Sequence, residues 1–212
     1  MTAAHCVTDD NNAVIRGVIA FLGVHNVRDL GSADQIQTVL GPRNILVHSA
    51  YDYARLGDGH DLALLRLPSE ARLNSKVRLI CLPKGPAPRS TAEMVVAGWG
   101  KTSLEAPPSE VLKTATMFTH EFGECNAYWE NYLGSPLAGN DLVLCARNGT
   151  GNVYFGDSGG FGGQKNGDQY EQWGVVSFGD LTLSPSSFTV FTDVRSHMIW
   201  LYQTMYPDNM KK

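Results

Sequence analysis

The sequence predicts an all-β fold, built as antiparallel barrels or as a sandwich. The 212 residues include 22 Gly and 10 Pro, which favours many tight turns and short strands over a helical bundle. Short apolar runs alternate with turn residues along the whole chain, and little lies between them that could form a crossover helix. A chain of this length forms one or two domains and buries a substantial core.

The predicted elements follow from these runs. The segments expected to be strands are residues 14–24, 45–48, 62–67, 77–82, 93–99, 111–119, 141–146, 173–178 and 188–194. One helix is predicted over residues 194–206, where apolar side chains recur at helical spacing and Pro207 follows. A weaker helical pattern covers residues 122–132.

Composition and charge exclude several classes of protein. With 43% hydrophobic and 18% charged residues, the chain is not a disordered one. Phosphate binding needs clustered Lys and Arg, and with a net charge of −4 no nucleic-acid partner is expected. No apolar run is long enough to cross a bilayer, so no membrane partner is expected.

The cysteines and the N-terminus leave the compartment open. Cys6, Cys81, Cys125 and Cys145 form no CxxC pair, which gives a zinc ribbon or a thioredoxin-type site no support. They are either paired in disulfides or buried free thiols. No signal peptide is visible, so either the protein is cytosolic or its beginning is missing.

The segment Gly-Asp-Ser-Gly-Gly at residues 156–160 is the most informative one. Glycines beside Ser158 allow a substrate to approach the backbone closely and let two N–H groups point at one oxyanion. The alternative is an ordinary polar turn. The segment also fits the G-x-S-x-G nucleophile elbow, but an elbow requires a helix directly after the serine, and residues 159–163 contain four glycines. We therefore reject the elbow.

A base and an acid for this serine are found in two further contexts. His5 lies in the segment Thr-Ala-Ala-His-Cys at residues 2–6, and Asp61 stands at the head of the apolar run 61–67. A carboxylate at the head of a buried strand needs a partner. The alternatives are a frayed terminal residue for His5 and a strand-end cap for Asp61.

Taken together and in this order, the three segments resemble the chymotrypsin-like (trypsin-fold) serine peptidases. Further segments that look like the family extend the resemblance over essentially the whole chain: residues 21–26, 80–83, 97–102, 174–179 and 190–194. The resemblance implies two six-stranded-type antiparallel β-barrels, the first one incomplete, and a C-terminal α-helix. It implies a first domain at residues 1–84 and a second at residues 92–212, separated in the Pro-rich stretch 83–89.

The resemblance also assigns chemical roles. His5 is the general base and then the general acid, Asp61 orients its imidazole, and Ser158 attacks the carbonyl. Gly156 and Ser158 supply the N–H groups of the oxyanion hole. The implied function is a serine endopeptidase that works through an acyl-enzyme intermediate. The alternative is a non-catalytic serine protease homologue that acts as a binding or regulatory scaffold.

The substrate pocket is expected to differ from that of trypsin. By resemblance, Asn152 lies at its base and Thr189 on its wall, while Ser177, Phe178 and Gly179 contact the extended substrate. A neutral Asn152 offers no Coulomb attraction to Lys or Arg, and Thr189 narrows the pocket. We therefore expect cleavage after small or medium uncharged residues.

Other family features are present only in part. The resemblance pairs Cys125 with Cys145 in a disulfide and leaves Cys6 and Cys81 without partners, because theirs would lie upstream of residue 1. Val24 stands in place of a calcium-binding carboxylate, so no metal and no cofactor are expected.

The start of the chain is expected to be incomplete. In the family, a new amino terminus pairs with the acid before the nucleophile, which here is Asp157. We expect an N-terminally truncated form of a secreted zymogen, its signal peptide lost with the missing segment. It would act as a monomer on protein or peptide substrates and meet protein inhibitors.

Overall fold

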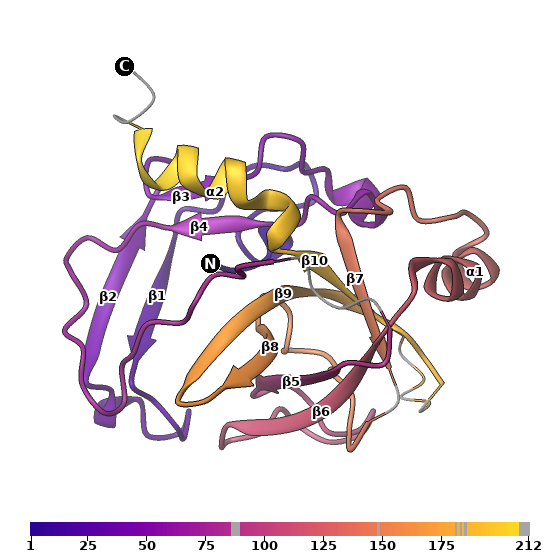
Figure 1. Ribbon diagram of the computed structural model, residues 1–212. Helices are drawn as coiled ribbons and strands as arrows, with labels where there is room; N and C mark the ends of the chain where they lie inside the picture. The colour runs from indigo at the N-terminus through magenta and orange to yellow at the C-terminus, as the bar shows by residue number, and fades with distance from the viewer. Residues whose placement is uncertain (86–89, 148, 181, 183, 185, 208–212) are drawn as a thin grey trace.

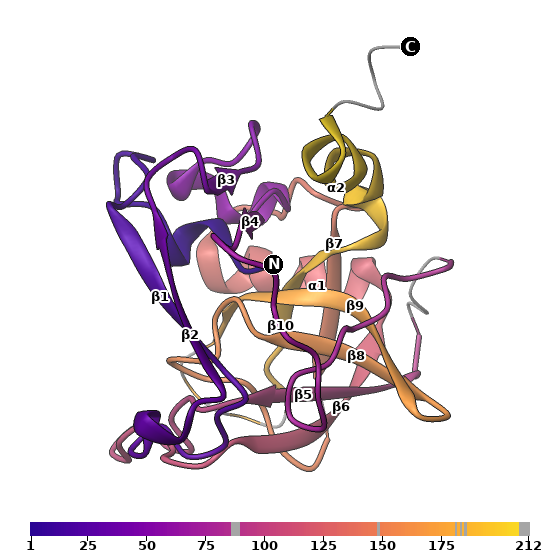
Figure 2. The ribbon, with the colours of Figure 1, turned by 90° about the vertical axis from the view of Figure 1, so that its left-hand side faces the viewer.

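The computed structural model describes residues 1–85, 90–147, 149–180, 182, 184 and 186–207 (Figure 1). A closed barrel forms the second half of the chain, and two small sheets form the first half. Figure 2, turned by 90°, shows β1 and β2 to one side of the barrel strands and α2 above them. Among the described residues, no helix has the length and apolar character needed to cross a membrane.

The barrel is made of six antiparallel strands in the closed order β10-β7-β6-β5-β8-β9. Apolar side chains such as Met94, Met117 and Phe191 are fully buried in its interior. Its strands are β5 (Glu93–Gly98), β6 (Lys113–His120), β7 (Val143–Arg147), β8 (Phe161–Asn166), β9 (Gln169–Gly179) and β10 (Thr189–Asp193).

In the first half, described over residues 1–85, the strands form two antiparallel pairs and no closed barrel. Strand β1 (Gly17–Leu22) pairs with β2 (Gln35–Leu40), and β3 (Ile45–Val47) pairs with β4 (Ala63–Leu65). Val39, Ile45 and Ala63 are buried in the core between them. The predicted all-β class with an incomplete first barrel is confirmed.

Two α-helices pack against these sheets. In α1 (Phe122–Leu133) the buried residues are Cys125 and Trp129, and Cys125 forms a disulfide with Cys145 of β7, the pairing that the resemblance implies. The C-terminal segment begins as the 3-10 helix η4 (Arg195–His197) and continues as α2 (Met198–Met205). Met198 and Leu201 pack in one cluster with Leu62 and Val175, which fastens α2 to both halves of the molecule.

Two of the strands, β8 and β2, are not predicted from the sequence. Strand β8 was not predicted because its sequence begins Phe-Gly-Gly and lacks β-branched residues. It forms because β5 and β9 supply backbone partners on both sides. The prediction also omitted β2, in which buried Gln37 and Val39 alternate with exposed residues.

The strand predicted over residues 77–82 is wrong. Only Cys81 pairs there, in an isolated parallel bridge with Glu171. Val77 is buried, but Leu79 and Ile80 are 82% and 42% exposed, so the run lacks the alternating burial of a strand that covers a core. Residues 86–89 of the Pro-rich stretch and residues 208–212 lie outside the described residues, and the proposed division into domains at residues 1–84 and 92–212 stays a prediction.

Candidate active site

Asp61 lies just before β4 and is 1% exposed. Its Oδ1 accepts a hydrogen bond of 2.9 Å from the backbone N–H of His5. Its Oδ2 lies 2.7 Å from His5 Nδ1 and accepts a hydrogen bond of 2.5 Å from Ser177 Oγ. The carbonyl oxygen of Asp61 accepts from Thr192 Oγ1 at 2.9 Å. Four hydrogen bonds therefore hold this buried residue in place.

The segment around His5 explains why the imidazole meets this carboxylate. His5 belongs to the 3-10 helix η1 (Ala4–Cys6). Thr2 exchanges backbone hydrogen bonds with Ala63 of β4, and Ala3 and Ala4 are fully buried. Small residues let the chain lie directly against β4, which brings His5 over the aspartate at the head of that strand.

The electrostatic environment of His5 is set by this pair. Burial by itself lowers the pKa of the imidazole, but the hydrogen bond and charge of Asp61, helped by Cys6, raise the pKa of His5 above its ordinary value. In the neutral form of His5, the contact with the carboxylate places the ring proton on Nδ1 and leaves Nε2 as the acceptor. This is the tautomer that a general base requires.

Ser158 lies in the turn that precedes β8, and its residue is exposed. Gly156 and Gly159 have φ values of +94° and +76°, a conformation that favours glycine. A Cβ at Gly159 would lie 2.2 Å from Thr2 Oγ1, so the turn packs directly against the His5 segment. Ser158 and His5 line the same cavity of about 200 Å³.

The serine and the histidine do not hydrogen-bond each other. In the described part of the chain, no hydrogen bond joins Ser158 Oγ to His5, and Cys6 Sγ lies 3.6 Å from His5 Nε2. Cys6 and Cys81 are free thiols, as the resemblance implies. The structure thus joins His5 to Asp61 and places Ser158 beside them without closing the second contact.

Two backbone N–H groups of the serine turn are unused. The N–H groups of Asp157, Gly159 and Gly160 donate to carbonyl oxygens. Within the residues that the structure describes, the N–H groups of Gly156 and Ser158 have no acceptor. These are the two donors assigned to an oxyanion.

Asp157 is held by backbone groups. Its Oδ1 accepts from Gly100 N at 2.8 Å and its Oδ2 from Tyr154 N at 2.9 Å. Burial raises the pKa of this carboxyl, and the two N–H groups oppose part of that effect. Among the described residues, no ion pair includes Asp157.

The residues predicted to bind substrate fall into two groups. Ser177, Phe178 and Gly179 line the cavity beside Ser158. Asn152 and Thr189 are absent from that lining, and Thr189 Oγ1 donates to Asn152 Oδ1 at 2.8 Å.

The hydrogen bond from Ser177 to Asp61 is not predicted from the sequence. Ser177 is expected there only as a substrate contact, whereas its buried hydroxyl donates to the carboxylate. Asp180 in the cavity wall, which accepts a hydrogen bond from the Tyr128 hydroxyl, is not predicted either. No local signal marks either contact, because the partners are far apart in the chain.

Among the described residues, one cluster of side chains could hold a metal ion. It consists of His48, His60 and His197. They do not line the cavity beside Ser158.

Comparisons with known proteins extend over nearly the whole chain. The family profile described as Trypsin matches residues 1–201, which include His5, Asp61 and Ser158. The chain is 32% identical over 204 residues to chymotrypsin-like elastase family member 1 of Bos taurus, covering 95% of this chain and 73% of that protein. The protein of the same name from Macaca fascicularis is 30% identical over 211 residues, with 97% and 74% covered. Granzyme F of Mus musculus is 30% identical over 210 residues, with 97% and 75% covered.

Proposed function

Because the chain belongs to the trypsin family, with elastase and granzyme relatives, we propose that it is a serine endopeptidase acting through His5, Asp61 and Ser158. The observation that carries the proposal is the buried carboxylate of Asp61, which accepts from both the backbone N–H and the ring of His5. A buried acid held in this way orients an imidazole and stabilises its charged form.

The reaction follows from the positions of these groups. Ser158 Oγ attacks the substrate carbonyl while His5 Nε2 takes its proton, and Asp61 stays ionised. The negative oxygen that forms is held by the free N–H groups of Gly156 and Ser158, each worth about 3 kcal/mol or more in such a site. His5 returns the proton to the leaving amine, which leaves an acyl-enzyme. A water molecule then releases the acid product by the same steps.

The proposed substrates are proteins or peptides cleaved after small or medium uncharged residues. Asn152 is neutral and is engaged with Thr189 and with Ser187, whose Oγ accepts from Asn152 Nδ2 at 3.3 Å. Asn152 therefore brings no carboxylate to the predicted base of the pocket, and Asp180 in the cavity wall is engaged with the Tyr128 hydroxyl. A secreted location fits the Cys125–Cys145 disulfide, because such bonds persist in oxidising compartments.

A specific observation favours a second candidate, a non-catalytic homologue that serves as a scaffold. His5 Nε2 contacts the thiol of Cys6, and no hydrogen bond joins it to Ser158 in the described residues. Catalysis by this chain requires Ser158 Oγ to take the place of that thiol.

Labelling with a fluorescent phosphonate that traps nucleophilic serines separates the two candidates. The peptidase predicts one labelled residue, Ser158, and no labelling of Ser158→Ala or His5→Ala. The exposed Ser69→Ala variant is the matched control and keeps the label. A folded chain that takes no label at any concentration supports the scaffold and overturns the peptidase.

A further inference from the structure

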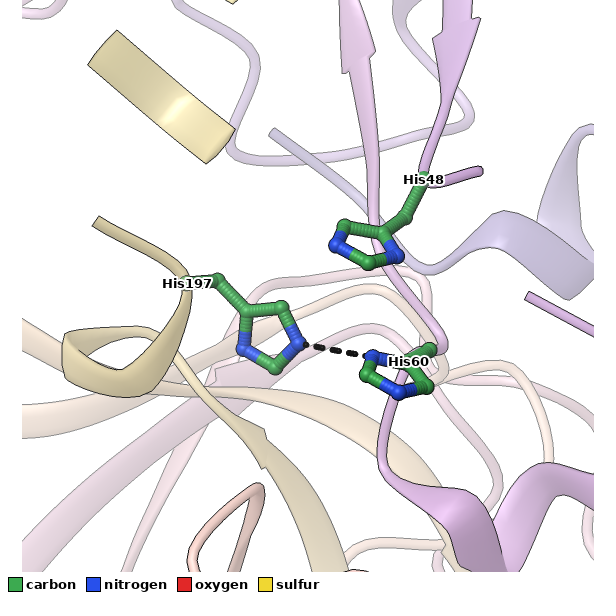
Figure 3. A group of neighbouring side chains, drawn as sticks. All are labelled: His48, His60 and His197. Atoms are coloured by element: carbon green, nitrogen blue, oxygen red, sulfur yellow. Dashed lines mark hydrogen bonds between the residues drawn. The ribbon is translucent and has the colours of Figure 1, made fainter. Parts of the chain in front are cut away.

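Three histidines from distant parts of the sequence meet beside α2. His48 directly follows β3, His60 lies between the 3-10 helix η3 (Tyr53–Asp58) and β4, and His197 ends η4. Figure 3 shows the ring of His197 directed at His60, with His48 alongside. His197 is buried and the other two are half-buried, so the cluster lies near the surface and is accessible to a small ion.

The spacing of two of the rings suits a metal ion. His60 Nδ1 and His197 Nε2 are 3.3 Å apart, and their ring planes are nearly perpendicular. Two nitrogens bound to one tetrahedral zinc ion at about 2.0–2.1 Å lie roughly 3.3–3.4 Å apart. The pair therefore already has the separation that a shared ion would impose.

His48 supplies the third nitrogen. One ligand atom from each of the three histidines lies within 4.8 Å of the others. The His48 ring stacks in parallel on His60 at 4.8 Å, so it must turn about its side-chain bonds to direct a lone pair at the same ion. The hydrogen bond that its Nδ1 accepts from Ala50 N is a long one of 3.3 Å, so a turn of the ring breaks only a weak bond.

The backbone presets the proton on His197. Its Nδ1 lies 2.7 Å from the carbonyl oxygen of Asp193, so Nδ1 carries the proton and donates it there. The lone pair is consequently on Nε2, the atom that faces His60. A ligating histidine is commonly oriented in this way, by donating its other N–H to a carbonyl group.

We propose that His48, His60 and His197 form a binding site for a divalent transition-metal ion of the zinc type, with a fourth position open to water. Imidazole nitrogens suit zinc, copper and nickel, whereas calcium and magnesium require oxygen ligands. Binding displaces the proton that His60 Nδ1 donates to His197 Nε2. That proton leaves to solvent while His60 Nε2 takes one up, so His60 binds as a neutral imidazole through Nδ1. This site differs from the expectation of no metal, which rested on Val24 at the calcium position and on the spacing of the cysteines.

Such an ion would join segments that are far apart in the chain. It would connect the start of α2 to the segments flanking β3 and β4, and it would sit next to Trp200, whose ring is 5.0 Å from that of His48. An ion that binds the folded state and not the unfolded state stabilises the folded chain. Zinc should therefore raise the thermal unfolding midpoint, and copper should quench the fluorescence of Trp200.

Zinc alone, added to the chain freed of metal by a chelator, tests the proposal. Isothermal titration should give one site with a raised unfolding midpoint, while calcium and magnesium should give neither. His60→Asn and His197→Gln should each weaken zinc binding at least tenfold. The matched control is His25→Gln, an exposed histidine outside the cluster, which should bind as the parent does.

The thiol beside His5 is the competing site and has its own control. Cys6→Ala removes that site and should leave zinc binding unchanged. Cobalt provides a readout independent of stability, because tetrahedral coordination gives an intense visible absorption that should vanish in His197→Gln. Zinc binding that survives His60→Asn and His197→Gln together, or that is lost in Cys6→Ala, overturns the proposal, as does no binding by the parent chain.

Discussion

Ser177 donates its hydroxyl to Asp61 Oδ2 across 2.5 Å, and the same oxygen lies 2.7 Å from His5 Nδ1. The two residues are 116 positions apart in the chain, one in barrel strand β9 and the other beside β4. This hydrogen bond connects the barrel to the small sheets of the first half at the acid of the proposed triad. The Ser177 hydroxyl and the His5 imidazole therefore both stabilise the charge of the buried carboxylate.

Ser177→Ala removes that donor and should affect both stability and the histidine. Removing one hydrogen-bond donor from a buried carboxylate should lower the free energy of unfolding by about 1–3 kcal/mol, which urea denaturation measures. With less of its charge compensated, Asp61 should hold the His5 proton more tightly, so the pKa of His5 should rise further in an NMR titration. Thr192→Val is the matched control, because its hydroxyl donates to the Asp61 carbonyl and not to the carboxylate. An unchanged His5 titration would contradict the assignment.

Asp61→Asn should lower the pKa of His5, since burial lowers it and the carboxylate is the main group that raises it. More of the imidazole is then neutral at pH 7, yet phosphonate labelling of Ser158 should slow by about 10⁴-fold, the loss seen for this change in a chymotrypsin-like triad. The wrong tautomer, and not protonation, is the cause. Exposed Asp10→Asn is the control. Labelling that keeps its rate would remove Asp61 from the mechanism.

Much of the candidate site could be predicted because its members stand in local contexts that carry a signal. Asp61 heads an apolar run and Ser158 lies among glycines, and these features identify the segments before any contact is known. The structure then places His5 on Asp61 and Ser158 in the same cavity. Contacts between distant residues carry no such signal, which is why the role of Ser177 was missed.

The fold shows the same division. Strands with buried apolar residues, such as β5 and β10, were located by their composition, because burial selects for such residues. Strand β8 forms because β5 and β9 pair with its backbone, and its own amino-acid composition gives no sign of these partners. The run at residues 77–82 fails for the converse reason, since Leu79 and Ile80 are apolar and yet exposed.

The disulfide between Cys125 and Cys145 should contribute measurably to stability. It closes a loop with a sequence separation of 20 between α1 and β7, for which chain entropy predicts about 3 kcal/mol. Urea denaturation of the variant with both cysteines changed to alanine should show a loss of that order. The matched control changes the free thiols Cys6 and Cys81 to alanine and should lose far less. Equal losses in the two variants would mean that the cross-link itself contributes nothing.

Thr189→Gly tests the proposed narrow pocket. Thr189 is 1% exposed and donates to Asn152, so removing its side chain empties space near the proposed base of the pocket. Cleavage after large apolar residues should increase at least tenfold relative to cleavage after alanine, measured as kcat/KM on matched peptides. Thr189→Ser keeps the hydroxyl and most of the bulk and should retain the parent's preference. If the glycine variant keeps that preference too, Thr189 does not limit the pocket.

Asp157 should make the stability of the chain depend on pH in a defined direction. Burial raises the pKa of this carboxyl in the folded chain above its ordinary value of 3.8, so the folded state binds a proton more readily than the unfolded state. Stability attributable to Asp157 therefore increases as the pH falls through the folded-state pKa toward 3.8. Relative to Asp157→Asn, which is uncharged throughout, the parent should gain unfolding free energy between pH 7 and pH 4 in urea titrations. Asparagine cannot make one of the hydrogen bonds of Asp157. That loss changes the difference in unfolding free energy between parent and variant by the same amount at every pH, so the slope of this difference against pH is unaffected. The exposed variant Asp10→Asn provides the reference slope. A slope of opposite sign for Asp157→Asn would show that the two N–H groups lower the pKa of Asp157 by more than burial raises it.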